Sequence, residues 1–231
     1  MKQKEYPDNW EKAILEDLLD YIQPTNYIVK STNYDNSYTT PVLTAGKSFI
    51  LGHTDETEGI FDILPTIIFD DFTTAIKYVT FPFKVKSSAM KILVPTSELV
   101  NMKYVYYFME TLRMNVDTHK RYWISVGSKI EIPFPPIEEQ VRIVQKIEQV
   151  FSELENTIKI IEDLSGERYS LSSISGKIGQ MRQIILKKAF NGELVEQNPN
   201  EKSASEVLNI IKSKKTIKEK SKKIKSKKLK K

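Results

Sequence analysis

A stiff, proline-rich segment divides the 231-residue chain, and a long stretch of heptad-spaced apolar residues follows it. The segment reads Ile132-Pro133-Phe134-Pro135-Pro136, in which proline fixes its own φ and keeps the preceding residue extended. Two apolar runs with spacings of three and four residues come next, a pattern that predicts helices packed against other helices. The runs are Val144, Ile147, Phe151, Leu154, Ile158, Ile161 and then Leu171, Ile174, Ile178, Met181, Ile185.

The phase of this apolar seam slips by one residue between the two runs, near Gly166. The pattern therefore leaves open whether the stretch forms one kinked helix or two helices. A seam of this length cannot bury its own apolar face, so it must fold back on itself, pack on its own domain or pair with a second chain. Asn191-Gly192 is a typical helix stop.

Residues 1–132 have a mixed α and β pattern, with a helix expected over Trp10–Ile22 and another over Ser97–Arg113. Short β-rich runs bounded by glycine and proline predict strands. They are Tyr27–Lys30, Pro41–Leu43, Ser48–Leu51, Ile67–Phe69, Tyr78–Phe83, Met90–Val94 and Ile124–Ile132. The expected fold is thus an α/β (α+β) globular domain followed by a long helical coiled-coil arm.

Four regions follow from these patterns: a globular domain over 1–132, the helical region over 133–195, a short terminal helix within 196–211, and a tail over 212–231. Ser203-Ala204-Ser205-Glu206 is a capping box that opens the short helix, which we expect to end near Ile211. The tail holds twelve lysines and one glutamate, and we expect it to be disordered in isolation.

The formal net charge of +5 hides a strong separation of charge along the chain. The tail carries +11, so residues 1–211 carry −6; within them residues 1–71 carry −8 and residues 72–130 carry +6. A polyanion would be drawn to residues 72–130 and to the tail. The absence of cysteine excludes disulfides and thiolate metal sites. The sequence shows no apolar span or signal peptide, which predicts a cytoplasmic protein.

Three motifs resemble those of a known family. Residues 132–144 match the pattern I-P-x-P-P-x-x-E-Q-x-x-I-V at every specified position, and residues 186–194 are similar to L-K-x-A-F-x-G-x-L. Pro7-Asp8-Asn9-Trp10 is similar to an opening P-x-x-W. These are motifs of the specificity subunits of type I restriction–modification systems, in which target recognition domains alternate with conserved helical regions.

The resemblance implies a non-catalytic subunit that reads DNA sequence. Full subunits of this family contain a recognition domain and a helical region twice in succession, whereas this chain has one of each. It resembles a half subunit, expected to form a homodimer that reads a palindromic split site or to pair with a different half. The resemblance also implies docking to methyltransferase subunits, which bring S-adenosylmethionine, and a possible restriction motor subunit. No cofactor or metal is expected on this chain.

Candidate DNA contacts come from the basic and small polar residues of the globular domain. Lys84 and Lys86 alternate with Val85, so both are expected on one strand face. An ordinary solvated strand face, or a core role for the aromatic residues, is the competing interpretation. The candidates are Lys47, Ser48, Lys77, Tyr78, Lys84, Lys86, Ser87, Ser88, Arg121 and Tyr122.

Two other function classes compete with DNA-sequence reading. Asp70-Asp71 follows an expected strand and could hold a metal in a small nuclease, although neighbouring aspartates on a strand point to opposite faces. The third interpretation is a coiled-coil adaptor whose globular domain binds protein. The Asn/Asp-Pro-Pro-Tyr/Phe loop of an adenine methyltransferase is missing from the sequence.

Overall fold

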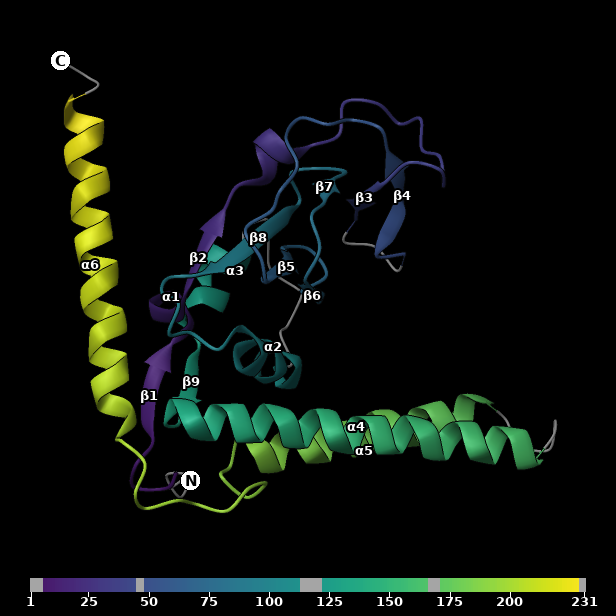
Figure 1. Cartoon of the computed structure of the whole chain (residues 1–231), viewed down its shortest axis with the longest axis vertical. Helices are drawn as coiled ribbons and strands as arrows, with labels where there is room; N and C mark the ends of the chain where they lie inside the picture. Colours follow the sequence, from purple (N-terminus) through teal and green to yellow (C-terminus); the bar gives the residue numbers. More distant parts are fainter. Residues whose placement is uncertain (1–5, 45–47, 113–121, 166–170, 229–231) are drawn as a thin grey trace. The chain divides into compact units, whose positions relative to one another are not determined.

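The computed structural model describes residues 6–44, 48–112, 122–165 and 171–228 (Figure 1). By contacts the chain divides into two compact units built from interleaved segments. Unit 1 comprises Met1–Lys12, Lys103–Leu112 and Pro133–Val207, and unit 2 comprises Ala13–Met102, Arg113–Ile132 and Leu208–Lys231. No described helix is long and apolar enough to cross a membrane.

Unit 2 is organised around an antiparallel four-stranded sheet with the order β2-β8-β5-β6. A three-stranded sheet, β4-β3-β7, combines an antiparallel β3–β4 pair with a parallel β3–β7 pair. Every residue of β5 is buried. The bounds are β2 Leu19–Ile22, β3 Thr40–Leu43, β4 Ile50–Thr54, β5 Thr66–Asp70, β6 Ile76–Val79, β7 Lys84–Val85 and β8 Met90–Pro95.

One apolar core joins the two sheets of unit 2. Its centre holds Phe61 and Phe83, whose ring centroids lie 5.2 Å apart. The other buried members are Leu43, Ile68, Val79, Val85, Met90, Ile92 and Val94. The short elements that complete the unit are α1 (Leu15–Leu18), η1 (Pro24–Tyr27), α3 (Tyr122–Ser125) and η2 (Gly127–Lys129); β1 (Glu11–Ile14) and β9 (Glu131–Phe134) pair in a two-stranded sheet.

Unit 1 contains α4 (Ile137–Ser165) and α5 (Leu171–Ala189), which lie side by side (Figure 1). They run antiparallel (Figure 1), and Arg182 of α5 stacks over the Phe151 ring of α4 at 3.8 Å. The helix α2 (Met102–Thr111) supplies Tyr104 and Phe108, which pack edge-on against Phe190 with centroid distances of 5.2 and 5.3 Å. The Tyr104 hydroxyl donates to the Pro133 carbonyl at 2.8 Å, which ties α2 to the proline segment.

The structure resolves the helix alternatives and corrects several expectations. The heptad stretch forms two helices that fold back on one another, α4 and α5. The helix expected over Trp10–Ile22 is wrong: the chain forms β1, one helical turn and β2, because Leu19–Ile22 pairs with β8. The segment Ile124–Ile132 forms α3 and η2 before β9, and Ser97–Arg113 is helical from Met102 to Thr111.

The expectation of a disordered tail is also wrong for the described residues. The short terminal helix continues as α6 (Ala204–Lys228), so the lysine-rich sequence is helical to Lys228. The segment Tyr27–Lys30 forms no strand, although Ile28 makes an isolated bridge to Val85. The remaining expected strands are found as β3, β4, β5, β6 and β8, with shifted ends for β4 and β6.

Candidate nucleic-acid interface and helical junction

Three segments of unit 2 bring basic and small polar side chains together. The Lys86 N–H donates to the Leu43 carbonyl at 2.9 Å, and the Thr44 N–H donates to the Phe49 carbonyl at 3.0 Å. The Lys77 ammonium lies 5.8 Å from the centroid of the Phe49 ring. The end of β3, the residues just before β4, the edge strand β6 and the residues after β7 therefore meet at one surface, which we name the basic face.

The basic face exposes several of the residues predicted from sequence. Their backbones are held by the two sheets, whereas their side chains reach solvent, as phosphate contacts require. These residues are Ser48, Lys77, Lys86, Ser87 and Ser88, and Tyr78 of β6 is half-buried. Lys47 and Arg121 lie outside the described residues.

Lys84 is not a surface residue, which corrects the expectation that it shares a face with Lys86. Its side chain is 2% exposed and pairs with the Glu56 carboxylate at 3.0 Å. Its ammonium also donates to the Glu58 carbonyl at 2.5 Å. The strand β7 contains only Lys84 and Val85, so the alternation that predicted a shared face ends before Lys86.

Glu56 is the centre of a cluster that holds three segments in place. Its Oε1 accepts the N–H groups of Lys30 and Ser31 at 2.7 and 2.9 Å. Burial opposes ionisation of Glu56, but these N–H donors and the Lys84 ammonium outweigh it and hold the pKa of the carboxyl below its usual value. Lys84 and Glu56 therefore position the loops rather than offer a contact to a ligand.

The aromatic pair Tyr122 and Trp123 divides between surface and core. Trp123 is buried and packs on Phe69 at a centroid distance of 5.4 Å, and Tyr122 is half-buried and stacks near the same ring at 6.3 Å. The core interpretation therefore holds for Trp123. The Tyr122 ring is anchored by Phe69 and leaves part of its surface accessible.

Asp70 and Asp71 are bound into the fold. Asp70 Oδ1 accepts the N–H groups of Phe72 and Thr73 at 2.8 and 2.6 Å, which shapes the turn after β5. Asp71 pairs with Lys91 at 3.1 Å and accepts the Trp123 N–H at 2.9 Å. Among the described residues no three His, Cys, Asp or Glu side chains are grouped as a metal site. The pair therefore gives the nuclease interpretation no geometric support.

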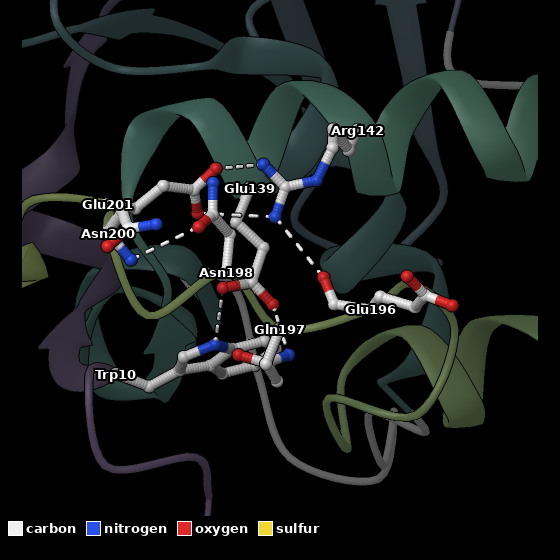
Figure 2. A network of polar contacts seen from close by, with 8 residues as sticks. All are labelled: Trp10, Glu139, Arg142, Glu196, Gln197, Asn198, Asn200 and Glu201. Carbon is white, nitrogen blue, oxygen red and sulfur yellow. Dashed lines mark hydrogen bonds and ion pairs between the residues drawn. The ribbon is translucent and has the colours of Figure 1, made fainter.

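A second site lies within unit 1, where the N-terminal segment meets the start of α4 and the chain after α5 (Figure 2). The Trp10 indole N–H donates to Glu139 Oε2 at 2.9 Å, and the Gln197 amide donates to Glu139 Oε1 at 2.5 Å. Glu139 is fully buried at the first turn of α4. One carboxylate thus joins three distant segments of the sequence.

Arg142 extends this network by one turn of α4. Its guanidinium pairs with both carboxylate oxygens of Glu201, and Nη2 also reaches the Glu196 carbonyl at 3.4 Å (Figure 2). Such a two-pronged pairing fixes geometry as well as charge. Through its contacts with the Glu201 carboxylate and the Glu196 carbonyl, Arg142 therefore holds residues 196–201 against α4.

The three motifs behind the family resemblance meet in this unit. Gly192 has a φ of +76°, and a Cβ there would lie 2.7 Å from Pro7 Cγ and 3.6 Å from the Trp10 ring. Glycine is required both by that backbone conformation and by the close approach. The opening Pro7–Trp10 segment, the start of α4 and the closing motif near Gly192 form one junction, which we name the motif junction.

The buried Glu139 carboxylate predicts a pH effect on stability. Burial raises the pKa of Glu139 above its reference of 4.5, although the donors on Gln197 and Trp10 act in the opposite direction. The folded chain then holds this proton more tightly than the unfolded chain does. The resulting stabilisation is complete below about pH 4.5 and is lost as the pH rises through the folded-state pKa, at about 1.4 kcal/mol per pKa unit.

We therefore expect the thermal midpoint of the wild type, relative to Glu139→Gln, to fall with pH above about 4.5 and then to become constant. Glu138 is exposed beside it, so Glu138→Gln is the matched control and should follow the wild type. Thermal unfolding of the three proteins across this pH range makes the measurement. A difference between wild type and Glu139→Gln that stays constant with pH would contradict the assignment.

The predicted seam residues divide into two groups along the helical hairpin of α4 and α5. Val144, Ile147 and Phe151 are buried within unit 1, so they serve the packing of the chain on itself. Further along, Ile161 and Met181 are 40% and 48% exposed, and Ile160 and Ile184 beside them are also exposed. Leu154, Ile158, Ile178 and Ile185 are half-buried, and the side chains of Leu171 and Ile174 lie outside the described ones.

Sequence reasoning missed the buried ionic contacts that organise both sites. Lys84–Glu56 and Lys91–Asp71 each join residues that are 20 or more positions apart, and no local pattern reveals such a pair. The Trp10–Glu139 bond was within reach, because both residues belong to motifs that the resemblance brings together.

Comparison with known proteins places these features in a family. The pattern of the type I restriction modification DNA specificity domain matches residues 7–165, which is more than half of the chain and includes both sheets of unit 2 and all of α4. The chain belongs to this family. Membership confirms the predicted family and lends no support to the nuclease and adaptor alternatives.

Proteins similar to this chain are named as specificity subunits of type I restriction enzymes. The chain is 46% identical over 155 residues to the type I restriction enzyme EcoR124I/EcoR124II specificity subunit of Escherichia coli, covering 61% of this chain and 38% of that protein. It is 33% identical over 94 residues to the EcoDI specificity subunit of E. coli, covering 37% and 19%. The chain thus spans well under two thirds of these relatives.

Among solved structures, the HsdS subunit from Thermoanaerobacter tengcongensis is similar to this chain, with a TM-score of 0.48 and 17% sequence identity. That alignment covers 84% of this chain and 48% of the other.

Proposed function

We propose that this chain acts as a DNA-specificity subunit of a type I restriction–modification complex. Residues 1–132 would read one half of a bipartite DNA site, and residues 133–195 would form a coiled-coil spacer that docks methyltransferase subunits. The observation that carries the proposal is the family match over residues 7–165, which includes the basic face and the helix α4 together. S-adenosylmethionine would be bound by the partner methyltransferase, and a restriction motor subunit could join the complex. Such a complex would act on DNA in the cytoplasm.

The basic face supplies the chemistry for the reading step. Lys77 and Lys86 are cations for phosphates, and Ser48, Ser87 and Ser88 can donate to phosphates or base edges. Lys84 and Glu56 lie beneath and fix the segments that carry them. Sequence choice would then depend on the loops that the Glu56 cluster and the two sheets position.

The helical hairpin supplies the spacing. A helix of 29 residues such as α4 is roughly 44 Å long at 1.5 Å per residue. One turn of DNA is roughly 34–36 Å, so a rigid hairpin of this length could set two recognition domains about one turn apart. We propose that the second domain comes from a second copy of the chain, which would place a two-fold axis on a palindromic split site.

Methylation mapping tests the proposal. The chain is expressed with the methyltransferase subunit of a type I system that binds it, and the modified bases are located on random DNA. A split palindromic motif is the expected result. An asymmetric motif would mean that a different half completes the site, and the lack of any complex with the methyltransferase subunit would overturn the proposal.

Substitution of both lysines of the basic face tests the reading surface. Lys77→Gln with Lys86→Gln should lower the slope of log affinity against log salt by about 2, because each lost phosphate contact removes about 0.9. Both side chains are exposed, so the thermal midpoint should change little. Fluorescence anisotropy titrations at several salt concentrations make the measurement.

The matched control removes two exposed lysines from the helical hairpin, Lys159→Gln with Lys187→Gln. It lowers the net charge by the same amount and should leave the slope nearly unchanged. An equal reduction by both pairs would mean that net charge, and not the basic face, governs DNA affinity.

A further inference from the structure

Two half-buried aromatic rings lie beside the cations of the basic face. Phe49 directly precedes β4, Phe81 follows β6, and both pack against the apolar core of unit 2. Their ring centroids lie 6.4 Å apart, with an angle of 59° between the ring planes. Each side chain keeps part of its surface accessible to solvent. We name this pair the aromatic patch.

The aromatic patch is held in place and is bordered by groups suited to phosphates. The Phe49 carbonyl accepts the Thr44 N–H at 3.0 Å, and packing on the core fixes the Phe49 ring. The Lys77 ammonium lies 5.8 Å from the centroid of that ring, and Ser48 beside it is exposed. A DNA backbone bound by Lys77 would therefore bring the bases of the same duplex close to a fixed apolar surface.

The strand pairing next to Phe49 is compatible with entry into a major groove. Strands β3 and β4 are antiparallel, and the pair Leu43–Ile50 ends their ladder next to Phe49. Phe49 thus lies at the connecting end of a two-stranded β-ribbon. The major groove of B-DNA is wide enough for such a ribbon.

The chemistry of the patch narrows what it can recognise in that groove. A phenyl ring offers no conventional hydrogen bond to a base edge, so its contact must be apolar. The apolar group that a base pair presents in the major groove is the C5-methyl group of thymine, and phenylalanine is one of the side chains that contact it. Most of the surface of Phe49 and of Phe81 is buried, which leaves room for a methyl contact rather than for stacking of a whole base.

We propose that the aromatic patch recognises the C5-methyl group of a pyrimidine in the major groove. The cations of the basic face would bind phosphates while the patch selects a base. Thymine carries this methyl group in unmodified DNA, and 5-methylcytosine carries it in modified DNA. The inference rests on the proposed function and deepens it, because it names a chemical feature of the half-site. Burial of one methyl group corresponds to about a fourfold gain in affinity, or about 0.8 kcal/mol.

The first test changes the DNA and leaves the protein as it is. Uracil in place of thymine removes the methyl group but keeps the Watson–Crick edge. The full chain, bound to its methyltransferase subunit, is titrated by fluorescence anisotropy with duplexes that carry the mapped motif. Each thymine of the half-site is replaced in turn by uracil, and in a parallel set each cytosine is replaced by 5-methylcytosine.

We expect uracil at one position to weaken binding about fourfold for each half-site that carries it. Uracil in the spacer should have no effect. Stronger binding to one 5-methylcytosine, with no effect of uracil, would support the same methyl contact and assign it to 5-methylcytosine. A defined motif that is insensitive to every uracil and every 5-methylcytosine would overturn the inference.

Substitution of Phe49 connects the methyl effect to the patch. In Phe49→Ala the ratio of affinities for thymine and uracil DNA should fall to about 1, whereas Phe49→Leu keeps an apolar side chain and should retain part of the ratio. The matched control is Phe72→Ala, which removes an exposed phenylalanine from the turn after β5 and should retain the full ratio. The ratio compares two DNAs on one folded protein, so a modest loss of stability does not alter it. A wild-type ratio in Phe49→Ala would overturn the assignment to the patch.

Failure of the proposed function gives a different result. The wild type would then bind motif and random duplexes equally and methylate no defined motif, and the inference would fail with the proposed function. If a motif is read and methylated but the methyl groups have no effect, the inference fails alone and the proposed function stands.

Discussion

Replacing Asp71 by leucine is expected to reduce the free energy of unfolding by about 3–5 kcal/mol. The Asp71 and Lys91 side chains are 5% and 7% exposed and lie 3.1 Å apart. Loss of the carboxylate leaves a buried ammonium without its counter-charge, and the Trp123 N–H loses its acceptor as well. Urea unfolding at neutral pH makes the measurement.

The control is the double variant Asp71→Leu with Lys91→Met. It removes the stranded charge, so it should be more stable than the Asp71→Leu single variant, because an apolar pair can replace a buried ion pair at little cost. Equal stability of the single and double variants would show that the two groups are not coupled. A stable Asp71→Asn protein that had lost a metal-dependent cleavage activity would instead revive the nuclease alternative.

The same buried pairs show where sequence reasoning stops. Period and charge predicted that Lys84 and Lys86 would share a face, yet one side chain is buried and the other exposed. The alternation rule holds only while the chain stays in a strand, and β7 ends after two residues. That length is decided by the parallel pairing with β3, which lies about 40 residues away and leaves no mark on the local sequence.

Non-local pairing also explains the error at the N-terminal end. The apolar residues Leu15, Leu18 and Leu19 are buried, but Leu19 begins a strand. Its partner is Pro95 of β8, and hydrogen bonding to β8 outweighs a modest local preference for helix. Burial was predictable here, whereas the backbone conformation was not.

In the tail and the helical region, by contrast, the sequence itself contained the signals for the structure. Repulsion among the lysines favoured the prediction of a disordered tail. The charge distribution of the sequence, with a basic tail and an acidic first third, pointed the other way. That separation was the available signal for the ion pairs between α6 and acidic residues of unit 2, such as Lys218 with Asp20. The helices α4 and α5 were predictable because a heptad pattern repeats many times within a short stretch, and the motif junction was predictable because its motifs resemble those of a known family.

Substitutions in the exposed part of the hairpin, at Ile161 and Met181, should have the second large effect, which is on assembly of the chain. Under the proposed pairing of two copies, Ile161→Glu with Met181→Glu should weaken self-association at least about 100-fold, because each substitution would place a charge in the proposed apolar interface. Both residues belong to the predicted seam and remain exposed on the folded chain, so the fold itself should tolerate the change. Analytical ultracentrifugation over a range of concentrations measures the association.

The matched control adds the same two charges at exposed polar positions of the same helices, Ser152→Glu with Gln180→Glu. It should associate like the wild type and retain methylation. The seam variant should keep its thermal midpoint and its binding to single half-sites, yet lose methylation of the split palindrome, since both half-sites must be held at once. Full methylation by a seam variant that is monomeric in the ultracentrifuge would show that the spacing of the two half-sites is not set by pairing of two hairpins.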